Sequence, residues 1–159
     1  MDNQENTTVL RGWGTAPTAK EKSAVQRAVT ELLDSLAPER VVKRGDMLHG
    51  PIEQHRTPSG CVLQAESAAL SVSWFADNRS ETLGELHVNV WRGVVSRGGS
   101  SHRKPAKASI VSERVLRPMT KTLEGCLWRM DDGKEFDTAA LTKHCIALLD
   151  AQIKAGNKS

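Results

Sequence analysis

The most basic stretch of the chain is the first candidate for chemistry. Between Arg92 and Lys121 there are eight Arg or Lys residues and one acidic residue, Glu113. Clustered cations attract phosphates and carboxylates over long distances and tolerate loose geometry, so this pattern favours an anionic partner. The candidate binding residues are Arg92, Arg97, His102, Arg103, Lys104, Lys107, Arg114 and Arg117. A solvated surface that keeps the protein soluble explains the same composition.

The centre of this stretch has the composition of a loop between two strands. Residues 97–105, with the sequence RGGSSHRKP, are rich in Gly and Ser and end in Pro. We call this segment, extended to Lys107, the basic loop. It lacks a phosphate-binding glycine pattern and has no aromatic side chain on which bases could stack. These features favour an acidic protein partner over sequence-specific recognition of single-stranded nucleic acid.

A row of polar side chains is the second candidate site. Glu85, His87, Asn89 and Trp91 occupy alternate positions, and alternate residues of a strand share one face of the sheet. Such a row can line a pocket between a sheet and its covering helices. The alternative is a sheet face that is simply exposed to water.

Patterns typical of catalysis or metal binding are weak. Cys61 has His49 and His55 nearby in the sequence, but its position at the start of an apolar strand favours an unreactive thiol. The two histidines lie near Asp46 and Glu53, yet no histidine spacing typical of a metal site occurs. We therefore expect no catalytic residues, no metal and no cofactor.

The strands that would position these residues are indicated by alternation of apolar and polar residues. Residues 70–74 alternate apolar side chains with serines, and the polar row falls in a second alternating stretch, predicted as a strand over residues 83–95. The turn-rich segment 77–82 separates them, which predicts adjacent antiparallel strands. Further strands are predicted at 41–48, 52–57, 61–66, 109–117 and 121–130, with Pro118 in the last connection.

Two helices are predicted to flank the strands. Thr18 and Glu21 match a capping box, and apolar residues from Val25 to Leu36 follow at helical spacing. Asp137 has the position of a cap for a second helix, with Gly156 at its end. The expected fold is α+β, a mainly antiparallel sheet of five to seven strands with an N-terminal and a C-terminal helix packed on one face. Residues 1–16 are predicted to be a mobile tail and residues 17–156 a single domain.

No apolar run approaches the roughly 18 residues of a membrane span. The first residues are polar and lack the pattern of a signal peptide. We therefore expect a cytoplasmic protein with no membrane association. The three cysteines, Cys61, Cys126 and Cys145, lie far apart without a CxxC spacing, which argues against a disulfide framework.

These observations predict a small non-enzymatic binding or accessory protein that docks an acidic protein partner through the basic loop and the sheet face. Nucleic-acid binding through the same loop is the first alternative. A small-molecule binding site or an enzymatic pocket between the sheet and the helices is the second.

Overall fold

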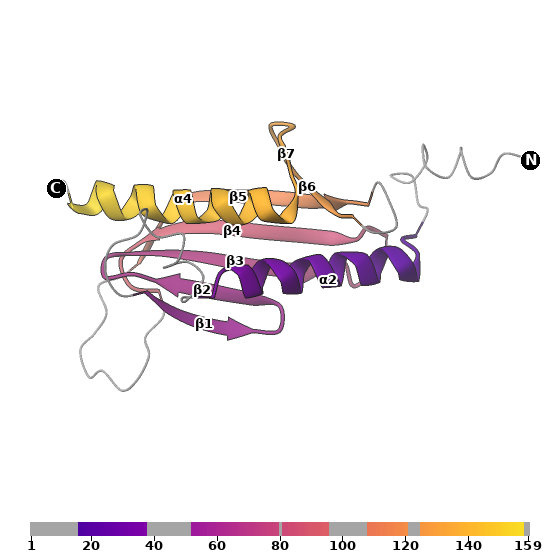
Figure 1. Ribbon diagram of the computed structural model, residues 1–159, viewed down its shortest axis with the longest axis horizontal. Helices are drawn as coiled ribbons and strands as arrows, with labels where there is room; N and C mark the ends of the chain where they lie inside the picture. Colours follow the sequence, from indigo (N-terminus) through magenta and orange to yellow (C-terminus); the bar gives the residue numbers. More distant parts are fainter. Residues whose placement is uncertain (1–15, 38–51, 80, 96–107, 121–124, 158–159) are drawn as a thin grey trace, which may run out of the picture.

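The computed structural model describes residues 16–37, 52–79, 81–95, 108–120 and 125–157. Within these ranges it contains two long helices and a seven-stranded antiparallel sheet, which confirms the predicted α+β class (Figure 1). The helices are α2 (Ala19–Ser35) and α4 (Thr138–Asn157). The strands are β1 (Glu53–Thr57), β2 (Gly60–Gln64), β3 (Ala68–Ala76), β4 (Gly84–Arg92), β5 (Ser109–Met119), β6 (Leu127–Met130) and β7 (Glu135–Phe136).

The sheet is a meander in which the strands lie side by side in their order along the chain. Each pair is antiparallel, and in the central pair Leu70 lies opposite Val90 and Val72 opposite Val88. The prediction of two adjacent antiparallel strands between residues 69 and 95 is therefore confirmed. A bulge between Val90 and Trp91 shifts the register of β4 against β5.

Both helices pack on one face of the sheet, where Figure 1 shows them in front of the strands and running in the same direction. The apolar residues of β2, β3 and β4 that alternate with polar ones all point into this core. Burying one such side chain stabilises the fold by about 1.5–3 kcal/mol. The rings of Trp74 and Trp128 meet edge to face in the same core, with centroids 5.8 Å apart.

The first helix begins at its predicted cap and is tied to the sheet at both ends. The Thr18 hydroxyl accepts from the Glu21 amide at 3.1 Å, and the Glu21 carboxylate accepts from the Thr18 amide at 3.0 Å. At the other end, the side-chain amide of Gln54 on β1 donates to the carbonyl oxygen of Leu36 at 3.2 Å. Edge strand β1 thus satisfies a helix carbonyl that lacks a partner within α2.

The second helix begins where predicted but ends later. Asp137 accepts a hydrogen bond from the Ala140 amide at 2.7 Å and so acts as the predicted cap. Gly156 lies inside α4 instead of following it, because the helix continues to Asn157. A glycine costs a helix only about 1 kcal/mol, and Lys154 pairs with Asp150 at 3.0 Å one turn earlier.

Several strand boundaries also differ from the prediction. Among the described residues, the strand predicted over residues 121–130 begins only at Leu127, and the short strand β7 was not predicted. Pro118 lies within β5, opposite Trp128 of β6, and not in a connection. A strand tolerates proline where its ladder needs no N–H donor, and the pairing of β5 with β4 ends two residues earlier at Leu116. The strand predicted over residues 83–95 is shorter, since β4 ends at Arg92.

Several predictions fall outside the described residues. They concern the tail up to Thr15, the strand at 41–48, and the basic-loop residues Arg97, His102, Arg103, Lys104 and Lys107. Of the helices that the structure describes, neither combines the length and the apolar character needed to cross a bilayer.

Candidate functional site

The polar row predicted on β4 lies on the sheet face away from both helices. Glu85, His87, Asn89 and Trp91 are half-buried, whereas the residues between them are buried in the core. We call this the outer face. Its central positions, set by the strand registers, are Val62, Ser71, Ser73, Phe75, Glu85, His87, Asn89, Trp91, Glu113, Val115 and Arg117.

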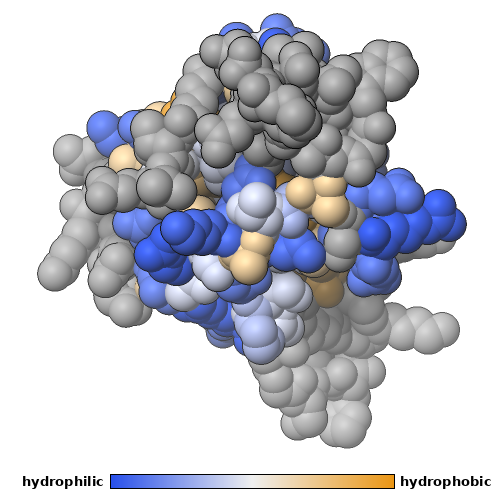
Figure 2. Space-filling view, turned by 90° about the vertical axis from the view of Figure 1, so that its right-hand side faces the viewer, coloured by the Kyte–Doolittle hydropathy of each residue, from blue (hydrophilic) through white to orange (hydrophobic). Residues whose placement is uncertain are grey.

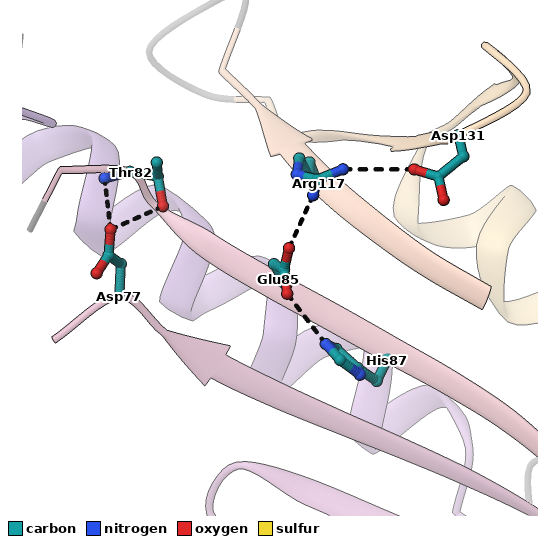
Figure 3. A network of polar contacts seen from close by, with 6 residues as sticks. All are labelled: Asp77, Thr82, Glu85, His87, Arg117 and Asp131. Carbon is teal, nitrogen blue, oxygen red and sulfur yellow. Dashed lines mark hydrogen bonds and ion pairs between the residues drawn. The ribbon is translucent and has the colours of Figure 1, made fainter. Parts of the chain in front are cut away.

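A charged network at one end of the outer face joins three elements (Figure 3). Glu85 on β4 accepts from Nη2 of Arg117 on β5 at 2.8 Å, and its other oxygen lies 3.2 Å from Nε2 of His87. Nη1 of Arg117 donates to Asp131, in the turn after β6, at 3.3 Å. Because the Arg117 side chain is 59% exposed, each ion pair is worth only about 0–1 kcal/mol to stability. The network orients the guanidinium more than it stabilises the fold.

Aromatic side chains continue from this network along the outer face. The edge of the Phe75 ring meets His87 with centroids 4.8 Å apart, while 55% of Phe75 remains exposed. Farther along the face, the Trp91 indole N–H donates to the Ser71 hydroxyl across the β3–β4 pair at 2.9 Å. Aromatic groups held by polar contacts on a sheet give a preorganised contact surface.

The turn between β3 and β4 is ordered by one carboxylate. Asp77 accepts a hydrogen bond from the Arg79 amide at 2.9 Å. It also accepts from the Thr82 amide at 2.9 Å and from the Thr82 hydroxyl at 3.0 Å (Figure 3). These donors, the Arg79 amide first, hold the pKa of Asp77 below its usual value. The turn leads into Gly84, whose φ of 125° favours glycine.

Two hollows adjoin this turn and share Arg117, Thr82 and Gly84. The larger, of about 660 Å³, is lined by the start of β4, the end of β5 and the turn after β6. The smaller, of about 490 Å³, lies between the β3–β4 turn and Phe75, and its lining includes Glu85. Figure 2 faces this end of the molecule and shows weakly hydrophobic side chains at its centre among hydrophilic ones.

The described basic candidates do not form one patch. Arg117 belongs to the network, and Arg92 is exposed at the end of β4. Arg114 lies opposite the core residue Val88 of β4. It is therefore on the helix side of the sheet, as Leu116 is two residues later. Its Nε is buried without a hydrogen-bond partner among the described residues.

His144 of α4 belongs to the same helix-side region as Arg114. Its ring stacks on Phe136 with centroids 4.9 Å apart. Burial, and then the charges of Arg114 and Lys134, lower the pKa of His144, so the folded protein favours its neutral form.

The cysteine thiols lie in surroundings that disfavour a nucleophile. Burial raises the pKa of Cys61 and Cys126 to about 11 and that of Cys145 to about 12. All three are therefore protonated at neutral pH, and a thiol attacks far more slowly than a thiolate. The described ranges contain no group of three or more side chains placed to hold a metal ion.

Some residues of this site were missing from the sequence prediction. The sequence prediction grouped Arg117 with the basic loop, but the register of β4 and β5 instead brings it to Glu85. Asp131 and Phe75 were not among the predicted site residues. Their meeting depends on strand pairing, for which the sequence gives no direct sign.

The geometry gives a preorganised contact surface beside two hollows, with no described residue set up as an activated nucleophile. Comparison with known proteins adds no assignment: no family model, no curated protein and no solved structure matches this chain.

Proposed function

We propose that this protein is a non-enzymatic binding module that docks an acidic protein partner on its outer face, with the basic loop contributing long-range attraction. The observation that carries the proposal is the aromatic row of exposed Phe75 and half-buried His87 and Trp91 on the sheet face that neither helix covers. Trp and Arg are enriched among the residues that dominate binding energy at interfaces.

The preference for an acidic partner comes from the chain that joins β4 to β5. That connection begins at the Trp91 end of the outer face and contains Arg97, Arg103, Lys104 and Lys107. The central outer face alone is not basic, because Arg117 is paired with two carboxylates and Glu113 adds a further negative charge. The loop therefore supplies attraction, and the aromatic row supplies contact area.

The experiment uses a photo-crosslinking amino acid in the full-length protein. Placed at Phe75, it is expected to trap a specific protein in the source cell, whereas the same group at Gln26, on the exposed side of α2, is expected to trap none. The trapped protein is then purified and its affinity measured directly. We expect Trp91→Ala to weaken binding about tenfold or more, since truncating an interface hot spot costs about 2 kcal/mol or more.

The loop is tested with the same purified partner. Replacing Arg97, Arg103, Lys104 and Lys107 together by Glu is expected to slow association and to abolish its salt dependence. Unchanged affinity in both the Trp91→Ala and the charge-reversed variants would show that the partner binds elsewhere.

Nucleic-acid binding through the basic loop is the second candidate, favoured by the eight cations between residues 92 and 121. It predicts an affinity for DNA or RNA that falls steeply with salt, because neutralised phosphates release counterions. Fluorescence anisotropy at low salt tests it, and failure to bind any duplex or single strand rules it out.

A further inference from the structure

The larger hollow exists because the sheet opens at one end. The pairing of β4 with β5 stops at Leu86 and Leu116, and Pro118, two residues later, has no N–H to continue a ladder. Beyond this point Gly84 and Pro118 both line the hollow. The Thr120 hydroxyl donates to the Glu21 carboxylate at 2.9 Å, which fixes the end of β5 against the start of α2.

The lining combines an apolar wall with two arginine residues. Pro17, Leu83, Pro118, Met119 and Met130 supply the apolar side chains, and most of the lining surface is apolar. Its volume of about 660 Å³ falls within the range of roughly 300–1,000 Å³ typical of small-molecule sites. Methionine side chains adapt to ligands of varied shape.

The two cations are Arg117 and Arg129, which lie directly opposite each other in the β5–β6 pair and both line the hollow. Like charges at directly opposite positions destabilise a sheet. Glu85 and Asp131 offset part of this repulsion through their contacts with Arg117, and Glu135 lies directly opposite Arg129 in the β6–β7 pair. An anionic group placed between the two guanidiniums would relieve the remainder and gain charge-assisted hydrogen bonds.

We propose that this hollow binds a small amphiphilic anion, a molecule with an apolar body and one carboxylate or sulfonate group. The apolar body lies against Leu83, Met119 and Met130, and the anionic group lies between Arg117 and Arg129. The carboxylates of Glu81 and Asp131, which also line the hollow, disfavour ligands with several negative charges. This hollow shares Arg117 with the outer face, but the proposed partner docking rests on Phe75 and Trp91, neither of which lines the hollow.

The test uses two ligands of equal length and the purified full-length protein. The dye 1-anilinonaphthalene-8-sulfonate, itself an apolar anion, is bound first, and octanoate or octanol is used to displace it. We expect octanoate to displace the dye at a concentration at least about tenfold lower than octanol requires, because a charge-assisted hydrogen bond is stronger than one to a neutral hydroxyl group. Equal potency of the two competitors overturns the proposal.

Variants locate the site. R129Q is expected to weaken octanoate binding about tenfold. The matched control is R27Q, which replaces an exposed arginine on α2 and is expected to bind octanoate like the wild type. Methionine-methyl NMR is expected to show octanoate shifting the resonances of Met119 and Met130. Wild-type octanoate affinity in R129Q, or unshifted Met119 and Met130 signals, places any binding outside this hollow and refutes the proposal whether or not Phe75 docks a partner.

Discussion

The alternating sequence of the strands gives the sheet two faces that differ in burial and polarity. On the helix side, Trp128 is completely buried in a core to which both helices contribute residues. On the outer face, Phe75 is more than half exposed, and Arg117, Glu85 and His87 contact one another at the surface. Stability is concentrated on the first face, so the second is free to vary its chemistry with little cost to the fold.

The largest contrast is expected between Trp128 and Phe75. Trp128→Ala removes a completely buried ring and its contact with Trp74, which should cost about 3–5 kcal/mol. Phe75→Ala loses an exposed ring and one edge contact, worth about 0.5–1.5 kcal/mol. Urea denaturation of both variants measures the difference, and similar losses would mean that the two faces contribute alike.

A second comparison separates close packing from backbone strain. Gly84 and Gly133 both have positive φ, but a Cβ at Gly84 would lie 2.3 Å from the Phe75 carbonyl oxygen, whereas nothing lies within 4 Å of one at Gly133. Left-handed backbone costs a non-glycine residue roughly 1–2 kcal/mol, and this is the loss expected for Gly133→Ala. Gly84→Ala should lose clearly more in the same denaturation assay. Equal losses would show that β3 and β4 can separate without penalty.

Most of the architecture was predictable because it follows from short-range patterns. The Thr18–Glu21 capping box and the Asp137 cap mark helix starts with specific hydrogen bonds, and both are present. Residues 70–74 and 84–92 alternate so regularly that only one register buries their apolar side chains. Pro118 was misplaced because proline usually interrupts a strand, and its tolerance here depends on where the β4 ladder stops.

The site was less predictable than the fold. The polar row on β4 was identified, since it needs only the period of one strand. The contacts of Arg117 with Glu85 and Asp131 and its position opposite Arg129 each require the pairing of separate strands. The sequence prediction grouped Arg114 with Arg117 because both are basic. Their positions in β5 place their side chains on opposite faces of the sheet.

The pH dependence of folding provides a probe of the helix side. The pKa of His144 is lowered in the folded protein from its ordinary 6.5, so the unfolded chain binds more protons as the pH falls through that value. Stability contributed by neutral His144 should therefore be complete above that pH and decline below it. Thermal unfolding at pH 7.5 and 5.5 should show a smaller loss for His144→Gln than for the wild type. An identical loss would assign the effect to other groups.

The smallest effect is expected at the network of the outer face. A double-mutant cycle with Glu85→Gln and Arg117→Gln should give a coupling energy of no more than about 1 kcal/mol, as for other exposed ion pairs. That coupling should shrink further in 1 M salt because the charges are screened. A coupling above about 2 kcal/mol at physiological salt would instead make the network a part of the core architecture.

The order of the strands has a consequence for synthesis of the chain on the ribosome. Each strand pairs with the one made just before it, so the sheet can grow hairpin by hairpin as the polypeptide emerges. Helix α4 is made after all seven described strands, and its Leu141, Cys145 and Leu149 are needed to complete the core. Until these residues leave the exit tunnel, part of the apolar face of β3 and β4 stays uncovered. The nascent sheet is therefore most open to chaperones or to aggregation just before α4 appears.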